Sequence, residues 1–122
     1  MIRKVAKTGV CVSDQQRAVD FYTQVLGFTL VADESMGPDA RWIEVGPPGA
    51  ETTLTLWTPP GLEDRIGTFT GVVLSCDDIQ ATYEELRARG VEFEKEPRDQ
   101  PGGVMASFRD PDGNTFVLRE GD

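Results

Sequence analysis

Histidine is absent from this chain of 122 residues, and cysteine occurs only twice. Without histidine, the chain lacks the commonest general base and the commonest metal ligand of proteins. Catalysis by a Ser-His-Asp triad or a Cys-His pair and zinc binding through histidines are therefore excluded. The two cysteines, Cys11 and Cys76, are too few for a disulfide framework and have no C-x-x-C spacing. We interpret them as reduced thiols and predict a cytoplasmic protein.

Long apolar segments and an excess of positive charge are absent as well. No apolar run comes near the roughly 20 residues that cross a bilayer, and the basic N-terminus is not followed by the apolar stretch of a signal peptide. Lys and Arg number 12 against 21 Asp and Glu, a formal net charge of −9. Nucleic acids and anionic lipids are bound mainly through clustered Lys and Arg. We therefore predict neither a nucleic-acid partner nor a membrane partner.

The residues that are present have the composition of a globular domain, with 39% hydrophobic and 27% charged residues. Their pattern first predicts a strand over 5–12, where apolar side chains alternate. Ser13 or Asp14 is then the expected N-cap of a helix that ends at Gly27. A second strand is expected from Phe28 onward. The first part of the chain therefore begins as strand, helix, strand.

Two further strands complete this unit, and the same order then returns. Residues 40–46 and 52–58 alternate at period two around a Pro-Pro-Gly turn, which predicts a hairpin. After a loop over 59–67, the chain repeats the order of strand, helix and three strands. The elements of this second half are predicted as a strand over 69–76, a helix from Asp77-Asp78 to Gly90, and strands over 91–96, 104–108 and 115–120.

A shift of 63 residues superposes the two halves of the chain. It places Asp77 on Asp14 and Gly90 on Gly27, so the expected helix start and the helix stop match at one offset. We therefore predict tandem βαβββ modules.

The predicted fold is a single α+β domain over 1–122, with module one over 1–62 and module two over 63–122. One helix covers only one face of each sheet, so the other face needs a partner or a ligand. The parity of the strands predicts a helix-facing core of Val10, Val12, Ile43, Val45, Leu54, Leu56, Val72, Leu74, Phe108, Phe116 and Leu118. The opposite face is mixed polar and aromatic and holds Lys7, Gly9, Cys11, Trp42, Glu44, Thr53, Thr55, Trp57, Gly71, Val73, Ser75, Met105, Ser107, Thr115, Val117 and Arg119.

Three motifs resemble those of the vicinal oxygen chelate superfamily, the group of glyoxalases, bleomycin-resistance proteins and extradiol dioxygenases. They are Phe21-Tyr22-x-x-Val25-Leu26-Gly27-Phe28, the Gly90-Val91 step, and Asp110-Pro111-Asp112-Gly113-Asn114 before the last strand. The resemblance covers essentially the whole chain. It implies paired βαβββ modules whose mixed sheets curl into a cup, often completed as a homodimer.

The residue types of the Asp-Pro-Asp-Gly-Asn segment by themselves predict a tight turn. Asp110 can cap the backbone donors of the turn, and Gly113 or Asn114 accepts a left-handed backbone conformation. We therefore expect this turn to be structural and assign no catalysis to its carboxylates.

The resemblance also bears on metal binding. Metal-dependent members such as glyoxalase I place a His or Glu on the first strand and a Glu on the last strand of each module. Residue by residue, these positions fall on Lys7, Thr55, Gly71 and Val117. An ammonium, a hydroxyl, a glycine and an apolar side chain do not replace imidazole and carboxylate donors. We therefore expect no metal site at these positions and no cofactor.

The resemblance leaves two functions open, and the first is binding alone. Metal-free members of the bleomycin-resistance type sequester a ligand in an aromatic-lined groove. The expected ligand is an aromatic or cationic small molecule, since tryptophan rings stack on planar groups and a carboxylate attracts cations. The predicted ligand-binding residues are Trp42, Glu44, Trp57, Met105 and Arg119. Packing of the tryptophans at a module or subunit interface is the structural alternative.

The second function is a glyoxalase-related enzyme, a lyase, an isomerase or a dioxygenase-like protein, that acts without the usual metal ligands. Lys7 and Glu44 are its catalytic candidates, because desolvation can lower the pKa of a lysine or raise that of a glutamate toward neutrality. Cys11 on the same face is a weaker candidate for a nucleophile. Against catalysis stands an ion pair of Glu44 with Lys7 or Arg119. The sequence leaves open whether the protein is an enzyme.

Overall fold

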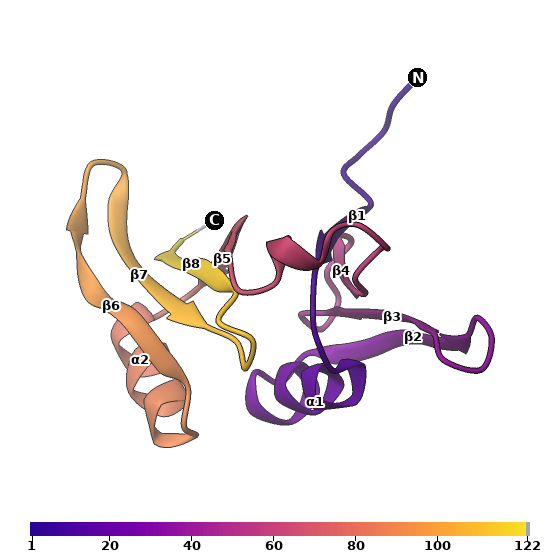
Figure 1. Ribbon diagram of the computed structural model, residues 1–122. Coiled ribbons are helices and arrows are strands. Elements are labelled where there is room, and N and C mark those ends of the chain that lie inside the picture. The colour runs from indigo at the N-terminus through magenta and orange to yellow at the C-terminus, as the bar shows by residue number, and fades with distance from the viewer. Residues whose placement is uncertain (122) are drawn as a thin grey trace. The chain divides into compact units, whose positions relative to one another are not determined.

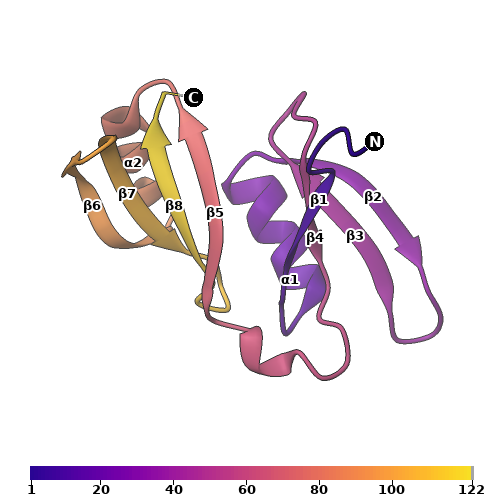
Figure 2. The same ribbon diagram turned by 90° about the horizontal axis from the view of Figure 1, so that it is seen from above.

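A computed structural model describes residues 1–121, and the chain in it divides into two compact units (Figures 1 and 2). The first unit runs from Met1 to Ile66, and the second begins at Gly67. We call them module one and module two and describe each by itself. Each consists of a four-stranded mixed sheet with a helix on one face, so the predicted α+β class and the βαβββ order are confirmed. No helix within residues 1–121 has the length and apolar character needed to cross a bilayer.

Module one has the strand order β1-β4-β3-β2, in which β1 runs parallel to β4 and the other neighbours are antiparallel. Its elements are β1 (Lys7–Val10), α1 (Gln15–Asp20), a π-helical turn η1 (Phe21–Val25), β2 (Thr29–Ser35), β3 (Arg41–Gly46), β4 (Thr53–Leu56) and a 3-10 turn η2 (Glu63–Arg65). The pair β3–β4 is the predicted hairpin. Helix α1 packs on β3 and β4. The apolar side chains buried in this module include Val10, Ala18, Tyr22, Ile43, Val45, Leu54 and Leu56.

Module two repeats this arrangement with the strand order β5-β8-β7-β6 and a parallel β5–β8 pair. Its elements are β5 (Phe69–Cys76), α2 (Ile79–Ala88), β6 (Glu92–Gln100), β7 (Gly103–Arg109) and β8 (Thr115–Glu120). Helix α2 packs on β6, β7 and β8, and the buried side chains include Ile79, Tyr83, Leu86, Phe108, Phe116 and Leu118. The prediction that Val72 and Leu74 are buried core residues is wrong. Both are only half-buried on the edge strand β5, whereas Val10 on the equivalent edge strand β1 is buried.

The two helices begin at the expected aspartates and end at the expected glycines. The number of residues between aspartate and glycine differs by one between the two modules. Asp14 and Asp78 each accept a hydrogen bond from a backbone N–H of the first turn at 3.0 Å. Gly27 and Gly90 follow the helices with φ of +78° and +93°. The residue that matches Asp14 is therefore Asp78 and not its predicted neighbour. The π-helical turn over Phe21–Val25 takes up the one extra residue between cap and glycine in module one.

The turn before β8 is held by its own side chains. Asp110 Oδ1 accepts hydrogen bonds from the backbone N–H groups of Asp112 at 3.0 Å and Asn114 at 2.9 Å. Asn114 Oδ1 in turn accepts the N–H of Gly67 at 2.8 Å, which ties the turn to the start of module two. Gly113 has the expected left-handed backbone, with φ of +87°. The predicted structural role of this turn is confirmed.

Candidate functional site

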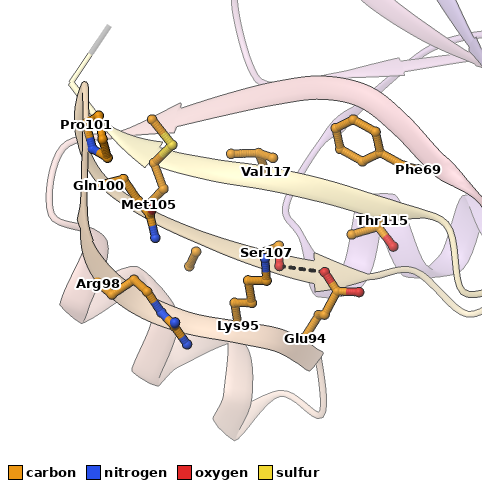
Figure 3. Close-up of a pocket in the computed structure, with 11 residues that line it drawn as sticks. Phe69, Glu94, Lys95, Arg98, Gln100, Pro101, Met105, Ser107, Thr115 and Val117 are labelled. Atoms are coloured by element: carbon orange, nitrogen blue, oxygen red, sulfur yellow. Dashed lines mark hydrogen bonds between the residues drawn. The ribbon is translucent and has the colours of Figure 1, made fainter.

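Module two has a pocket of about 460 Å³ on the sheet face opposite its apolar core (Figure 3). Strand residues alternate between the faces of a sheet, so Phe108 and Phe116 enter the core while their neighbours face the pocket. Strands β5, β7 and β8 supply a floor of mostly small or apolar side chains, and β6 supplies a polar wall. The floor consists of Phe69, Met105, Ala106, Ser107, Thr115 and Val117, and the wall with its turn consists of Glu94, Lys95, Arg98, Gln100 and Pro101.

Lys95 and Arg98 of β6 both line this pocket, at two irregularities of the strand, and both also border a second hollow beside Tyr83 and Arg87 of α2. Lys95 pairs with Ser107 and Arg98 pairs with Met105, although an odd and an even position of a regular strand face opposite sides. The register shifts between Phe93 and Lys95 and again between Lys95 and Arg98, as it does at β-bulges. The predicted ligand face contained no residue of β6. The signal for this wall in the sequence is the run of charged residues in β6, which Phe93 and Pro97 interrupt.

The charges that line the pocket are not balanced within it. Glu94 is the acidic residue of the lining, and its carboxylate accepts hydrogen bonds from Ser107 Oγ at 3.1 Å and from Arg109 Nη2 at 3.2 Å. Neither Lys95 nor Arg98 forms an ion pair with any residue from 1 to 121. The pocket therefore presents two uncompensated positive charges beside one carboxylate that is already paired.

A buried carboxylate occupies the corresponding face of module one. Glu44 of β3 is 7% exposed. Its Oε1 accepts hydrogen bonds from Lys7 Nζ at 2.9 Å and from Thr53 Oγ1 at 3.0 Å, and its Oε2 accepts one from Trp42 Nε1 at 2.7 Å. The donors lie on β1, β4 and β3, so this Glu44 network connects three neighbouring strands. The ion pair expected as the alternative to catalysis is therefore formed with Lys7.

This network sets the acidity of Glu44. The hydrogen bond from the Lys7 ammonium, followed by that from the Trp42 indole, holds the pKa of Glu44 below its ordinary value, and the Thr53 hydroxyl adds to the effect. Burial acts in the opposite direction but is the weaker influence. The expectation that desolvation raises this pKa toward neutrality is therefore wrong, because the donors outweigh burial. Glu44 is an ionised acceptor at neutral pH.

The two tryptophans lie together in module one, as their shared parity predicted. The ring centroids of Trp42 and Trp57 are 6.0 Å apart, and the planes are inclined at 56°. Both side chains are half-buried, so part of each ring is open to contact. Cys11, the weaker catalytic candidate, is a half-buried cysteine outside any disulfide, just beyond the end of β1.

The other two predicted ligand-binding residues belong to module two. Met105 lines the pocket. Arg119 pairs with Met105 in the β7–β8 register but is not among the lining residues, and its Nη2 donates to the carbonyl oxygen of Gly102 at 2.7 Å. The structure therefore places Arg119 against the β6–β7 turn. Its Nε is buried without a hydrogen-bond partner among residues 1–121.

The four positions where metal-dependent relatives hold their ligands do not fit a divalent ion. Lys7 is engaged by Glu44, and Thr55 offers a single hydroxyl. Gly71 has no side chain, and Val117 is apolar. Among the described residues, no three Cys, Asp or Glu side chains come together as a potential metal site. Imidazole and carboxylate donors of the kind that divalent ions need are thus missing from this arrangement.

Comparison with known proteins identifies relatives of the whole chain. A family model of the Glyoxalase/Bleomycin resistance protein/Dioxygenase superfamily matches residues 4–118. A superfamily member from Sphaerobacter thermophilus DSM 20745 is 42% identical, with a TM-score of 0.90 over 98% of both chains. TnmS3, an antibiotic binding protein from Streptomyces sp. CB03234, is 38% identical, with a TM-score of 0.87 over 99% of this chain and 98% of that one. Lactoylglutathione lyase from Escherichia coli is 32% identical over 125 residues, covering 96% of this chain and 92% of that protein.

Proposed function

Since the chain belongs to the Glyoxalase/Bleomycin resistance protein/Dioxygenase superfamily, we propose that it binds a small aromatic molecule and does so without a metal ion. The observation that carries this proposal is the pocket of module two, with its volume of about 460 Å³. Sites for small organic ligands have volumes of roughly 300–1,000 Å³, apolar walls and a few polar groups. The similarity to the antibiotic binding protein TnmS3 supports the same assignment.

The metal-free part of the proposal rests on the chemistry of the donor positions. Lys7, Thr55, Gly71 and Val117 supply one hydroxyl and an ammonium that is already paired. Glu44 is the nearby carboxylate of module one, and both of its oxygens already accept hydrogen bonds from protein donors. A metal ion would have to displace these donors before it could coordinate Glu44.

The tryptophan pair is a second proposed contact surface. Trp42 and Trp57 each present a partly open ring, and such rings stack on planar ligands with about 1 kcal/mol beyond the area they bury. The indole N–H of Trp42 is held by Glu44, which fixes the orientation of that ring. We expect an added ligand to quench the tryptophan fluorescence. The quenching should be smaller in Trp42→Phe and in Trp57→Phe. Unchanged quenching and affinity in both variants would remove the tryptophans from the proposal.

A second candidate function is an enzyme related to the glyoxalases, and the similarity to lactoylglutathione lyase favours it. The geometry supports this function less well. The lowered pKa of Glu44 makes this residue an ionised partner of Lys7 at neutral pH rather than a proton donor. Incubation of a bound compound with excess protein, followed by mass spectrometry, separates the two functions, because a binding protein returns the compound unchanged.

The direct test titrates the protein with naphthalene, quinoline and acridine derivatives after treatment with EDTA. We expect saturable binding that neither EDTA nor added Ni, Co, Zn or Mn changes. Val117→Phe should weaken binding at least tenfold, because it fills the floor of the pocket. Val31→Phe is the matched control, since Val31 lies on β2 of module one and is 54% exposed.

Two outcomes would contradict the proposal. Binding that is equally strong in Val117→Phe and Val31→Phe would move the ligand site away from the pocket. Affinity that disappears with EDTA and returns with one metal would show a metal-dependent site. We also propose the homodimer implied by the family resemblance, for which light scattering should give twice the chain mass of 13.4 kDa.

A further inference from the structure

We propose that the pocket of module two selects ligands with an anionic group, such as a carboxylate, phenolate or sulfonate, on a flat apolar body. This inference rests on the proposed function and names the class of ligand for the same site. It departs from the cationic ligand expected from the net charge of the chain and from Glu44. The observation behind it is that Lys95 and Arg98 face this pocket without a counterion.

Comparison of the two modules shows that module two lacks the carboxylate that module one has at the equivalent position. In the β3–β4 pair of module one, Glu44 lies opposite Thr55, and in the β7–β8 pair of module two, Ser107 lies opposite Val117. Glu44 and Ser107 therefore occupy equivalent positions on their sheets. Module one has a carboxylate at this position that neutralises its cation, whereas module two has a hydroxyl.

The charges of strands β2 and β6, which occupy equivalent places in the two sheets, also differ. In register with the neighbouring strand, β6 places Lys95 and Arg98 where β2 places Ala32 and Glu34. The wall of module two therefore carries two cations where the wall of module one carries a methyl group and a carboxylate. Combined with the difference on the floor, this reverses the sign of the charge that the face offers to a ligand.

Glu94, the carboxylate in the pocket lining, does not neutralise Lys95 and Arg98. Glu94 is held by Arg109 and by the Ser107 hydroxyl, at 3.2 and 3.1 Å. Glu96 and Asp99 are neighbours of these cations along β6, but neither lines the pocket, and neither forms an ion pair with Lys95 or Arg98 among residues 1–121. Within the lining of the pocket, two cations therefore stand against one carboxylate that is already paired.

The shapes of the two cations suit a planar anion. A guanidinium binds a carboxylate or a sulfonate through parallel N–H donors, and an ammonium adds a third donor. Figure 3 shows Lys95 extending from β6 toward Ser107 and Arg98 lying along β6, next to the strands that carry Met105 and Val117. The aromatic body of a ligand would contact the floor of the pocket while its charged group meets the wall.

The test uses three probes with one ring system, naphthoate, naphthamide and naphthylmethylammonium, in NMR titrations of the EDTA-treated protein. We expect naphthoate to bind about tenfold more tightly than naphthamide and the cation to bind most weakly. In the Lys95→Gln/Arg98→Gln double variant, naphthoate should fall to the affinity of naphthamide, while naphthamide itself is unchanged. Arg3→Gln/Lys4→Gln removes two exposed cations outside the pocket and is the control with the same net charge.

The outcomes separate this inference from the function on which it rests. Equal binding of the three probes, or no effect of the double variant on naphthoate, would overturn the anion selectivity and leave a binding protein. The tightest binding by the cation would overturn it as well. Absence of binding by all three, with no shifts of the resonances of Met105 or Val117, would count against the proposed function itself. Equal losses of naphthoate affinity in Arg3→Gln/Lys4→Gln and in Lys95→Gln/Arg98→Gln would also overturn the inference, because the effect would then come from net charge and not from the pocket.

Discussion

Module one and module two have the same strand order and equivalent registers, yet the exposed faces of their sheets differ in chemistry. The face of module one is occupied by the Glu44 network, in which Lys7, Trp42 and Thr53 all donate to one carboxylate. The face of module two is a pocket with an unpaired cationic wall. A duplicated backbone therefore carries one face whose carboxylate is engaged by neighbouring strands and one face with an open pocket.

A single position accounts for much of this difference. A buried carboxylate must be paired, because an unpaired charge in a poorly hydrated site costs several kcal/mol. Glu44 therefore requires its donors and holds them in place, whereas Ser107 makes one hydrogen bond and leaves the neighbouring cations free. The loss or gain of one carboxylate on a sheet thus decides whether the charges around it are engaged by the protein or are open to a partner.

The largest effect is expected from removing this carboxylate. Glu44→Ala leaves the Trp42 indole and the Thr53 hydroxyl without their acceptor, and it leaves Lys7 unpaired. We expect the free energy of unfolding to fall by about 3 kcal/mol. In module two, Ser107→Ala removes one hydrogen bond from Glu94, which keeps Arg109, so a loss of about 1 kcal/mol or less is expected. Urea denaturation measures both, and equal losses would show that the two faces do not differ in this way.

An intermediate effect is expected from pH. The pKa of Glu44 in the folded protein lies below its ordinary value of 4.5. The stability that this carboxylate contributes is therefore complete above pH 4.5 and is lost as the pH falls through the folded-state pKa. The difference in unfolding free energy between wild type and Glu44→Gln should be largest near pH 7 and should narrow below pH 4. In a Lys7→Met background the narrowing should be smaller, because the main cause of the lowered pKa is gone. A difference that is constant with pH would contradict the assigned network.

The smallest effect concerns the neutralisation of Glu94. Arg109→Ala frees this carboxylate, which becomes a counterion for Lys95, so the affinity for naphthoate should fall about threefold while that for naphthamide is unchanged. Arg89→Ala, which removes an arginine from a surface pair on α2, is the matched control. Glu94→Gln should act in the opposite direction and tighten naphthoate binding. If Arg109→Ala and Arg89→Ala have the same effect, Arg109 does not shield the pocket.

Much of the fold could be predicted because its signals are local. The helix starts at Asp14 and near Asp78, the left-handed glycines at Gly27 and Gly90, and the Asp110 turn all follow from hydrogen bonds within a few residues. Apolar alternation located β1, β3 and β4, and the repeated order of elements located most of the others. The error of one residue in the repeat arose from the π-helical turn of module one, which sequence periodicity does not reveal.

The candidate site was less accessible to prediction. Parity correctly grouped Trp42 with Trp57 and placed Met105 on the sheet face that holds the pocket. It missed Lys95 and Arg98, since a β-bulge changes which parity faces a ligand and depends on pairing with the neighbouring strand. It also misjudged the acidity of Glu44, because donors distant in sequence control that pKa.

The sequence by itself determined the tandem modules, the ends of the helices and the lack of histidine ligands, because each depends on residue type and on neighbours along the chain. Only the tertiary structure decided which charges are engaged. Lys7 and Glu44 are 37 residues apart and meet through the β1–β4–β3 order of the sheet, whereas bulges in β6 turn Lys95 and Arg98 toward the pocket of module two. Net charge and composition do not record such pairings, since the sign that a ligand meets depends on which carboxylates are already bound to a neighbour.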